Sequence, residues 1–238
     1  MGKFISSILV LVLLFSCAEK KETPKVIYEK PVTEGKKPTQ KAVSTLKVAD
    51  LPVYIDGTKY LLHPMGEVRI TEQERTLESS STSVSYRVSN YDPFELTGEL
   101  QNIGFQHIDS LKSYTLTDKI IHIQSVTYLK KVADKHKKQF LLYVLADNDT
   151  NKDGKTNAND IKCLYISTIN GKNFKKLSTN FQELLDWEYI EATNTVYFRT
   201  IEDTNKNGSF DNADTLFYQL INLHKPELTV ETYNPFKN

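Results

Sequence analysis

The chain has 238 residues, and its 30 Lys and Arg side chains balance 30 Asp and Glu side chains, so the formal net charge at pH 7 is zero. A chain without excess positive charge lacks the long-range field that attracts nucleic acid, and we expect no nucleic-acid partner. The length suits one or two domains with a sizeable core, and the thirteen Tyr and eleven Phe residues favour β structure, because aromatic rings pack well on a pleated surface.

The first residues have the layout of a secretory signal peptide. Lys3 precedes an almost wholly apolar run, Phe4–Phe15, which is too short to span a bilayer as a helix, since that takes about twenty residues. The run ends in Leu14-Phe15-Ser16-Cys17, which resembles the lipobox of bacterial lipoproteins. The resemblance implies cleavage before Cys17 and its acylation with more than one chain, as stable anchoring requires. In such families Ala18 implies sorting to the outer membrane; the alternative is an ordinary signal peptide with a coincidental cysteine.

Three regions follow from this interpretation. Residues 1–16 are the predicted signal peptide, and residues 17–45, rich in Lys, Glu, Thr and Pro, are a predicted lipid-anchored flexible tether with a coil dimension of about 30 Å. Residues 46–238 are the predicted folded domain. Once Cys17 carries lipid, only Cys163 is left, so no intrachain disulfide can form and another device has to stiffen the exported domain.

From Leu46 onward, short apolar runs alternate with turn residues, which predicts an all-β domain. The predicted strands are Val53–Ile55, Ser83–Val88, Ile103–Ile108, Ile120–Val126, Phe140–Ala146, Cys163–Ile169, Val196–Ile201 and Leu216–Leu223. Two other segments are the best candidates for a helical turn, namely Tyr128–His136 and Phe181–Trp187.

A hairpin pattern recurs along the predicted domain. Leu164–Ser178 contains an Asn-Gly turn, Ile103–Thr117 has the same shape and spacing, and Leu216–Leu228 is a third copy with an altered turn. The pattern resembles the short WD40-like repeats of TolB-type β-propellers. This resemblance implies a propeller-like fold of repeated antiparallel sheets with strand–loop–strand insertions. The alternative is a β-sandwich whose hairpins merely look alike.

The segment Asp149–Asp160 fits the twelve-residue calcium loop of EF-hand type position by position. Calcium takes about six to eight oxygen ligands at about 2.3–2.6 Å, so the loop has to direct oxygens inward from several places. Gly154 stands at position 6, where the chain turns sharply. The predicted ligands, with a backbone carbonyl at position 7, are Asp149, Asn151, Asp153, Lys155, Asn157 and Asp160.

The segment Asp203–Asp214 repeats this plan, with Gly208 at position 6 and Phe210 as the apolar residue at position 8. Its predicted ligands, again with one carbonyl at position 7, are Asp203, Asn205, Asn207, Ser209, Asp211 and Asp214. The alternative is a pair of purely structural turns that use Asp, Asn and Gly for their turn propensity. Turn formation alone does not demand an acid at position 12, so two calcium ions are the prediction.

The loops also resemble those of dockerins and thrombospondin type-3 repeats. Here predicted strands flank both loops, so calcium is expected to brace strand connections rather than to open a pair of helices. Each loop has three carboxylates, one of which is the Asp at position 12. This composition predicts a dissociation constant of about 10⁻⁴–10⁻³ M, as in extracellular modules.

The sequence contains no Gly-x-Ser-x-Gly elbow, His-Glu-x-x-His, phosphate loop or Cys-x-x-Cys pair, and we predict no catalytic residues. His107 and His122 alternate with apolar residues, which favours solvent-facing or hydrogen-bonded structural roles. The predicted function is that of a lipid-anchored envelope protein whose calcium-stabilised β scaffold binds a protein or a glycan. The alternative is a calcium-dependent hydrolase or lyase acting on an envelope or environmental polymer.

Overall fold

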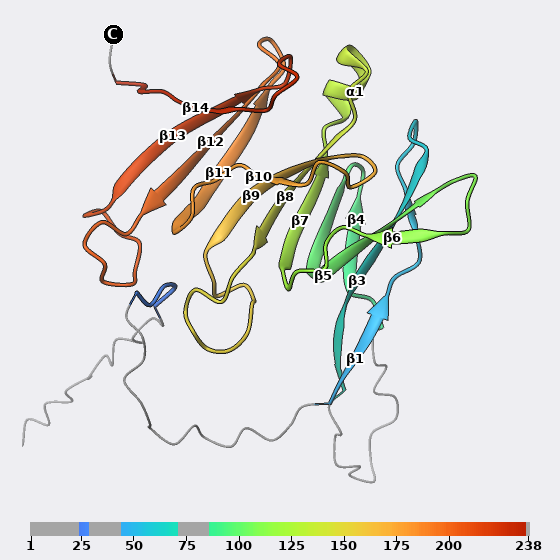
Figure 1. Cartoon of the computed structure of the whole chain (residues 1–238), viewed down its shortest axis with the longest axis horizontal. Helices are drawn as coiled ribbons and strands as arrows, with labels where there is room; N and C mark the ends of the chain where they lie inside the picture. The colour runs from blue at the N-terminus through green and yellow to red at the C-terminus, as the bar shows by residue number, and fades with distance from the viewer. Residues whose placement is uncertain (1–23, 29–43, 71–85, 237–238) are drawn as a thin grey trace, which may run out of the picture.

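The computed structural model describes residues 24–28, 44–70 and 86–236, which form two antiparallel sheets side by side (Figure 1). The larger sheet contains β1 (Ser44–Ala49), β2 (Val53–Tyr54), β3 (Tyr60–Ile70), β4 (Ser89–Asp92), β5 (Glu95–His107), β6 (Ser113–Thr115), β7 (His122–Tyr128), β8 (Phe140–Ala146), β9 (Lys162–Thr168) and β10 (Lys175–Lys176). The smaller sheet contains β11 (Gln182–Ile190), β12 (Thr195–Glu202), β13 (Thr215–Asn222) and β14 (Val230–Thr232). The predicted all-β class is confirmed.

The two sheets share a repeated plan. Strands β7 to β10 and strands β11 to β14 each run as four consecutive antiparallel neighbours. In both sets the acidic loop joins the second strand to the third, because Ala146 pairs with Lys162 on either side of one loop and Glu202 pairs with Thr215 on either side of the other. The predicted strand–loop–strand insertions are therefore confirmed, and Figure 1 shows both loops at the same end of the molecule.

Strand β8 is continuously apolar because both of its faces are covered. Leu141, Tyr143 and Leu145 belong to a core enclosed by β3, β5 and β7, and each of these three residues is 0% exposed. Leu142 points the other way, into a second core that includes Phe198 of β12. The smaller sheet therefore packs its inner face on β8 and β9, and this second core lies between the two sheets.

The hairpin predictions hold at the level of strand pairing. Ile166 pairs with Lys175 across the β9–β10 hairpin, and Gly104 pairs with Thr115 across the β5–β6 hairpin. In the third copy the returning strand is β14, which begins at Val230, beyond the predicted end at Leu228, and there Val230 pairs with Ile221. The predicted strand Ser83–Val88 lies partly outside the described residues, and β4 begins just after it.

One helical prediction is confirmed and one is wrong. Helix α1 (Lys130–His136) lies within the predicted segment Tyr128–His136, whereas Phe181–Trp187 lies largely in strand β11. A register shift between Leu184 and Asp186 marks a bulge that interrupts the two-residue alternation, so the apolar spacing imitates a helical period. Among the described residues, no helix is long and apolar enough to cross a membrane.

Gly171 lies in the turn of the β9–β10 hairpin with a φ of 71°, and a Cβ there would lie 2.5 Å from the ring of Phe105. Phe105 is fully buried, so the ring has little freedom to move. Gly57 has a similar φ of 79°, but a Cβ there would meet nothing within 4 Å. Substitution of Gly57 therefore adds backbone strain alone, whereas substitution of Gly171 adds the same strain and a steric clash in the core.

We expect Gly171→Ala to lower the free energy of unfolding by about 2–4 kcal/mol, because backbone strain is added to overpacking. The matched variant Gly57→Ala should cost only about 1 kcal/mol, the strain alone. Urea titration of both variants measures the difference. Equal losses would show that the Phe105 ring yields without cost.

Candidate metal loops and the segment that joins them

The first loop is folded around the carboxylate of Asp149. This carboxylate accepts hydrogen bonds from the backbone N–H groups of Asp153 at 3.1 Å and Gly154 at 2.8 Å. Gly154 adopts a φ of 87°, a conformation that glycine takes without steric cost. The sharp turn expected at position 6 is therefore present.

The last residue of this loop, Asp160, closes the turn from the opposite end. It is fully buried, and its carboxylate accepts hydrogen bonds from the N–H groups of Thr150 at 2.7 Å and Asn157 at 2.9 Å. The same carboxylate accepts two longer hydrogen bonds, from the hydroxyl of Thr150 and the N–H of Asn151, each at 3.2 Å. Asp160 therefore holds the two ends of the loop together.

The second loop reproduces this network at an offset of 54 residues, from Asp149 to Asp203. Asp203 is 2% exposed and accepts hydrogen bonds from the N–H groups of Asn207 at 3.1 Å and Gly208 at 2.7 Å. Asp214 accepts from the N–H groups of Thr204 at 3.0 Å and Asp211 at 2.9 Å. Two loops with different sequences thus adopt the same hydrogen-bonded conformation.

The predicted ligand side chains converge within each loop. In the first loop, one oxygen of Asp153 lies 3.5 Å from the amide of Asn151 and 3.4 Å from the amide of Asn157. In the second loop, the amide of Asn207 lies 3.3 Å from a carboxylate oxygen of Asp211. The oxygens of Asn151, Asn157 and Asn207 in turn accept backbone N–H groups inside their loops. Carboxylate and amide oxygens are the ligand types that calcium takes.

The two position-7 residues fit the same scheme. The N–H of Lys155 donates to Asp153 at 2.9 Å, and the N–H of Ser209 donates to Asn207 at 2.7 Å. Asn205 also accepts from the N–H of Asn207 at 2.9 Å. Among the described residues, no group of three or more His, Cys, Asp and Glu side chains forms a metal-binding cluster, and the predicted donor sets instead mix carboxylates with amides and a carbonyl.

Residues 24–28 lie against both loops, and we call this segment the strap (Figure 1, blue). The N–H of Lys25 donates to the carbonyl of Gly208 at 2.9 Å, and the N–H of Ile27 donates to the carbonyl of Thr150 at 2.9 Å. The hydroxyl of Thr150 donates back to the carbonyl of Lys25 at 2.8 Å. The strap therefore joins the loop of one sheet to the loop of the other.

Val26 anchors the strap and is only 1% exposed. It packs with Ile161 and Cys163, which follow the first loop, and with Phe210 of the second loop. Burial of a valine side chain stabilises by about 1.5–3 kcal/mol. The sequence places this segment in the predicted flexible tether of residues 17–45, and the structure packs residues 24–28 of that region on the folded domain through Val26. Cys17 lies outside the described residues.

The flanking strap residues add polar and aromatic contacts. The ammonium of Lys25 lies 2.6 Å from Glu183, whose side chain is 6% exposed and also lies 3.3 Å from the ammonium of Lys162. Tyr28 lies beside Phe181, with ring centroids 6.2 Å apart. Burial, followed by the charge and hydrogen bonding of Asp203, raises the pKa of Tyr28 to about 12.

A cavity of about 420 Å³ lies beside the first loop and is partly lined by the strap. On its wall the carboxylate of Asp147 lies 2.7 Å from the ammonium of Lys176 and 2.6 Å from the hydroxyl of Tyr165. Burial alone would raise the pKa of Asp147, but the hydrogen bonds from Lys176 and Tyr165 outweigh burial and hold the pKa below its ordinary value. Asp147 therefore acts as a fixed carboxylate.

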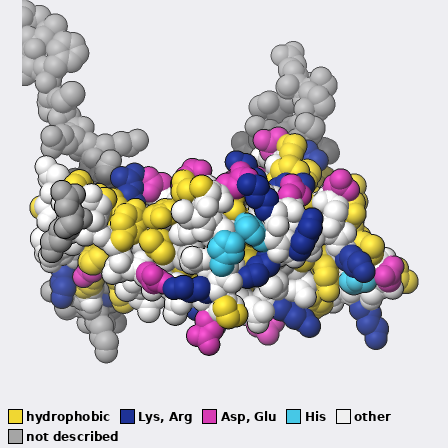
Figure 2. Space-filling model, turned by 90° about the horizontal axis from the view of Figure 1, so that it is seen from above, with side chains coloured by type: hydrophobic (Ala, Val, Ile, Leu, Met, Phe, Trp, Pro, Cys, Tyr) yellow, Lys and Arg dark blue, Asp and Glu magenta, His cyan; other side chains and the backbone are white. Residues whose placement is uncertain are grey.

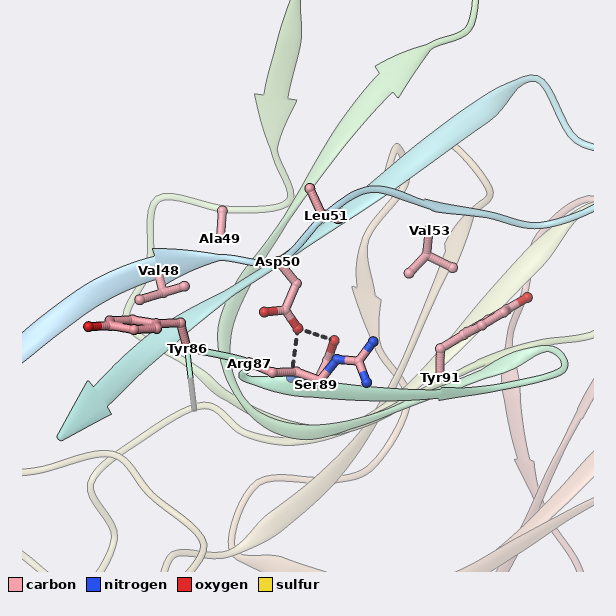
Figure 3. A pocket seen from close by; sticks show the side chains of 9 residues that line it. All are labelled: Val48, Ala49, Asp50, Leu51, Val53, Tyr86, Arg87, Ser89 and Tyr91. Carbon is pink, nitrogen blue, oxygen red and sulfur yellow. Dashed lines mark hydrogen bonds between the residues drawn. The ribbon is translucent and has the colours of Figure 1, made fainter. Parts of the chain in front are cut away.

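A second cavity, of about 370 Å³, lies between β1, β2 and β4 (Figure 3). Figure 3 shows the Asp50 carboxylate directed at Ser89, and it accepts hydrogen bonds from the N–H and hydroxyl of Ser89 at 2.8 and 2.5 Å.

The face of the molecule seen in Figure 2 carries no patch of a single charge sign, because Lys and Arg side chains alternate there with Asp and Glu. This mixture accords with the zero net charge.

His122 is buried rather than solvent-facing, because β7 lies inside the larger sheet between paired strands. It is 5% exposed, and its Nε2 lies 3.4 Å from a carboxylate oxygen of Glu99. Within the described part of the chain, that Nε2 has no hydrogen-bond partner. Burial lowers the pKa of His122 below its ordinary value, although the charges of Glu99 and Asp160 act in the opposite direction.

Comparison with known proteins gives few relatives. No protein-family model matches the chain, and a search of curated proteins found no match. One similar solved structure is that of a provisionally assigned TolB from Agrobacterium tumefaciens, with 10% sequence identity and a TM-score of 0.23 over 79% of this chain and 80% of that chain. A likeness of this strength assigns no function, so function has to be inferred from the loops, the strap and the surfaces of this chain.

Because the folded state holds His122 with a lowered pKa, the unfolded state takes up a proton near pH 6.5 that the folded state does not. We therefore expect His122 to reduce stability as pH falls below about 6.5. Urea midpoints at pH 7.5 and 5.5 measure the loss, which should be smaller in His122→Leu. Equal losses in both chains would assign the pH dependence to other groups.

Proposed function

We propose that the chain is a lipid-anchored protein of the bacterial cell envelope, with a β scaffold that is braced by two calcium ions and binds a protein or glycan partner. The observation that carries the proposal is the pair of acidic loops that share one hydrogen-bond network at equivalent places in two equivalent strand sets. The motif Leu14–Cys17 supports the lipid anchor, and Ala18 supports its placement in the outer membrane.

Calcium would neutralise the charge that each loop gathers. Each loop contains three Asp residues within twelve positions. Like charges within one short loop repel, and the repulsion opposes the turn that the backbone hydrogen bonds impose. The residues that would hold the two ions are the two predicted ligand sets, ending at Asp160 and Asp214. Since both loops connect paired strands, the ions would stabilise the scaffold rather than move helices apart.

A binding role is supported by the outer face of the smaller sheet. Its aromatic face consists of Tyr197, Tyr218, Tyr233 and Phe236, whose neighbouring ring centroids lie 5.4–5.9 Å apart. Phe236 is 82% exposed, and two shallow cavities of about 340 and 350 Å³ meet at Tyr233. Aromatic rings of this kind are typical of surfaces that bind proteins, and they also offer a flat platform for sugars.

The carboxylates near the cavities support a non-enzymatic role. Asp186 forms a two-point ion pair with Arg199, and that hydrogen bonding holds the pKa of Asp186 below its ordinary value. Asp147 and Asp50 likewise accept hydrogen bonds from fixed donors. A general acid at neutral pH needs a raised pKa, which is the opposite of what Asp186 and Asp147 have.

Removal of calcium should lower the thermal unfolding midpoint of the full chain. An ion that binds only the folded state stabilises it by about 2.7 kcal/mol at a hundredfold excess over the dissociation constant. Circular dichroism melting curves in millimolar calcium and in chelator measure the shift. The double variant Asp149→Ala with Asp203→Ala should lose the shift, and each single variant should keep part of it. An unchanged curve for the native chain would reject calcium binding.

The aromatic face should be required for partner binding. Capture from detergent-solubilised envelope extract should fall at least tenfold for the double variant Tyr233→Ala with Phe236→Ala, since truncation of central aromatic contacts costs about 2 kcal/mol or more. Leu111→Ala is the matched control, because Leu111 is 98% exposed in the loop between β5 and β6. Protease treatment of the extract separates a protein partner from a glycan. Undiminished capture by the double variant would place binding elsewhere.

A further inference from the structure

The strap contacts backbone groups whose positions depend on the folded conformation of the two loops. Its two N–H donors use the carbonyls of Thr150 and Gly208, at positions 2 and 6 of their loops. Gly208 has a φ of 84°, and a Cβ there would lie 2.8 Å from both Pro24 and the carbonyl oxygen of Val26. At the equivalent Gly154 a Cβ would meet nothing within 4 Å. The sharp turn of the second loop at Gly208 thus also forms the surface that the strap contacts.

The strap also shields groups that belong to the loops. Val26 packs on Phe210 at position 8 of the second loop and on Ile161 directly after the first loop. Lys206 lies over the ring of Tyr28, with its ammonium 5.9 Å from the centroid. A loop that loosens would therefore lose apolar, backbone and ring contacts with the strap together.

We propose that the strap is a calcium-linked latch: calcium in the two loops and the docked strap stabilise each other, and calcium removal releases residues 24–28 from the loops. This inference rests on the calcium sites proposed above. The linkage is reciprocal, because whatever factor calcium adds to strap docking, the docked strap adds to calcium affinity. Couplings of this kind amount to about 5–150-fold in affinity.

Release of the strap would change the reach of the lipid anchor. With the strap docked, only the chain from Cys17 to Pro24 separates the acylated residue from the domain, a span of at most about 25 Å. With the strap free, the tether runs from Cys17 to the start of β1 at Ser44, a span of at most about 95 Å. Calcium would hold the loop end of the domain near the membrane.

Two measurements on the full chain test the latch. The first is the rate of endoproteinase Lys-C cleavage after Lys25, located by mass spectrometry, in calcium and in chelator. We expect cleavage after Lys25 to rise at least fivefold in chelator, whereas cleavage after Lys112, an exposed residue in the loop between β5 and β6, should not change. The second is calcium affinity by isothermal titration calorimetry for the native chain and for Val26→Asn, with Leu51→Asn at an 87% exposed site as the matched control.

Val26→Asn should bind calcium at least fivefold more weakly than the native chain, and Leu51→Asn should bind as the native chain does. If Val26→Asn does not fold, Ile27→Pro provides the same test, because it removes the N–H that bonds to Thr150 and leaves the Val26 side chain in place. Equal affinities in the native chain and the strap variants would overturn the latch and leave the calcium sites standing. Absence of calcium binding by the native chain would overturn both.

Discussion

Each turn that carries an acidic loop has to accommodate three Asp residues within twelve positions, and the rest of the site depends on how this constraint is met. In each loop, backbone N–H groups point inward at the acids, and glycine at position 6 allows the reversal. The inward N–H groups compensate part of the negative charge at the cost of fixing the backbone. A fixed backbone then presents carbonyls outward in a constant pattern, and the strap uses two of them.

The position of these loops follows from the core. Because β8 is apolar on both faces, it carries the larger sheet's interior on one side and the smaller sheet on the other. Its end at Ala146 is thereby fixed, and so is the start of the first loop. Strand β12 carries Phe198 into the shared interior in the same way, which fixes the start of the second loop. The two loops lie at the same end of the molecule (Figure 1).

Much of this arrangement could be predicted from sequence because its causes are local. An acid at positions 1 and 12 with glycine at position 6 is a local pattern, and so is the apolar run Phe140–Ala146, which matches β8 residue for residue. The bulge after Leu184 hid strand β11, since one extra residue converts alternation into an apparent helical spacing. The strap was missed because its stability comes from residues more than a hundred positions away, such as Glu183. The signal present was Val26-Ile27-Tyr28, three β-forming residues within a stretch of Lys, Glu and Pro.

The strap also has a mechanical meaning. Any pull on the chain preceding Pro24 enters the domain through backbone bonds to Gly208 in one sheet and Thr150 in the other, so both sheets bear the load at once. The strap bonds run to loops rather than to a strand edge, so they can break without unzipping either sheet. Under such a load the strap would give way before either sheet does.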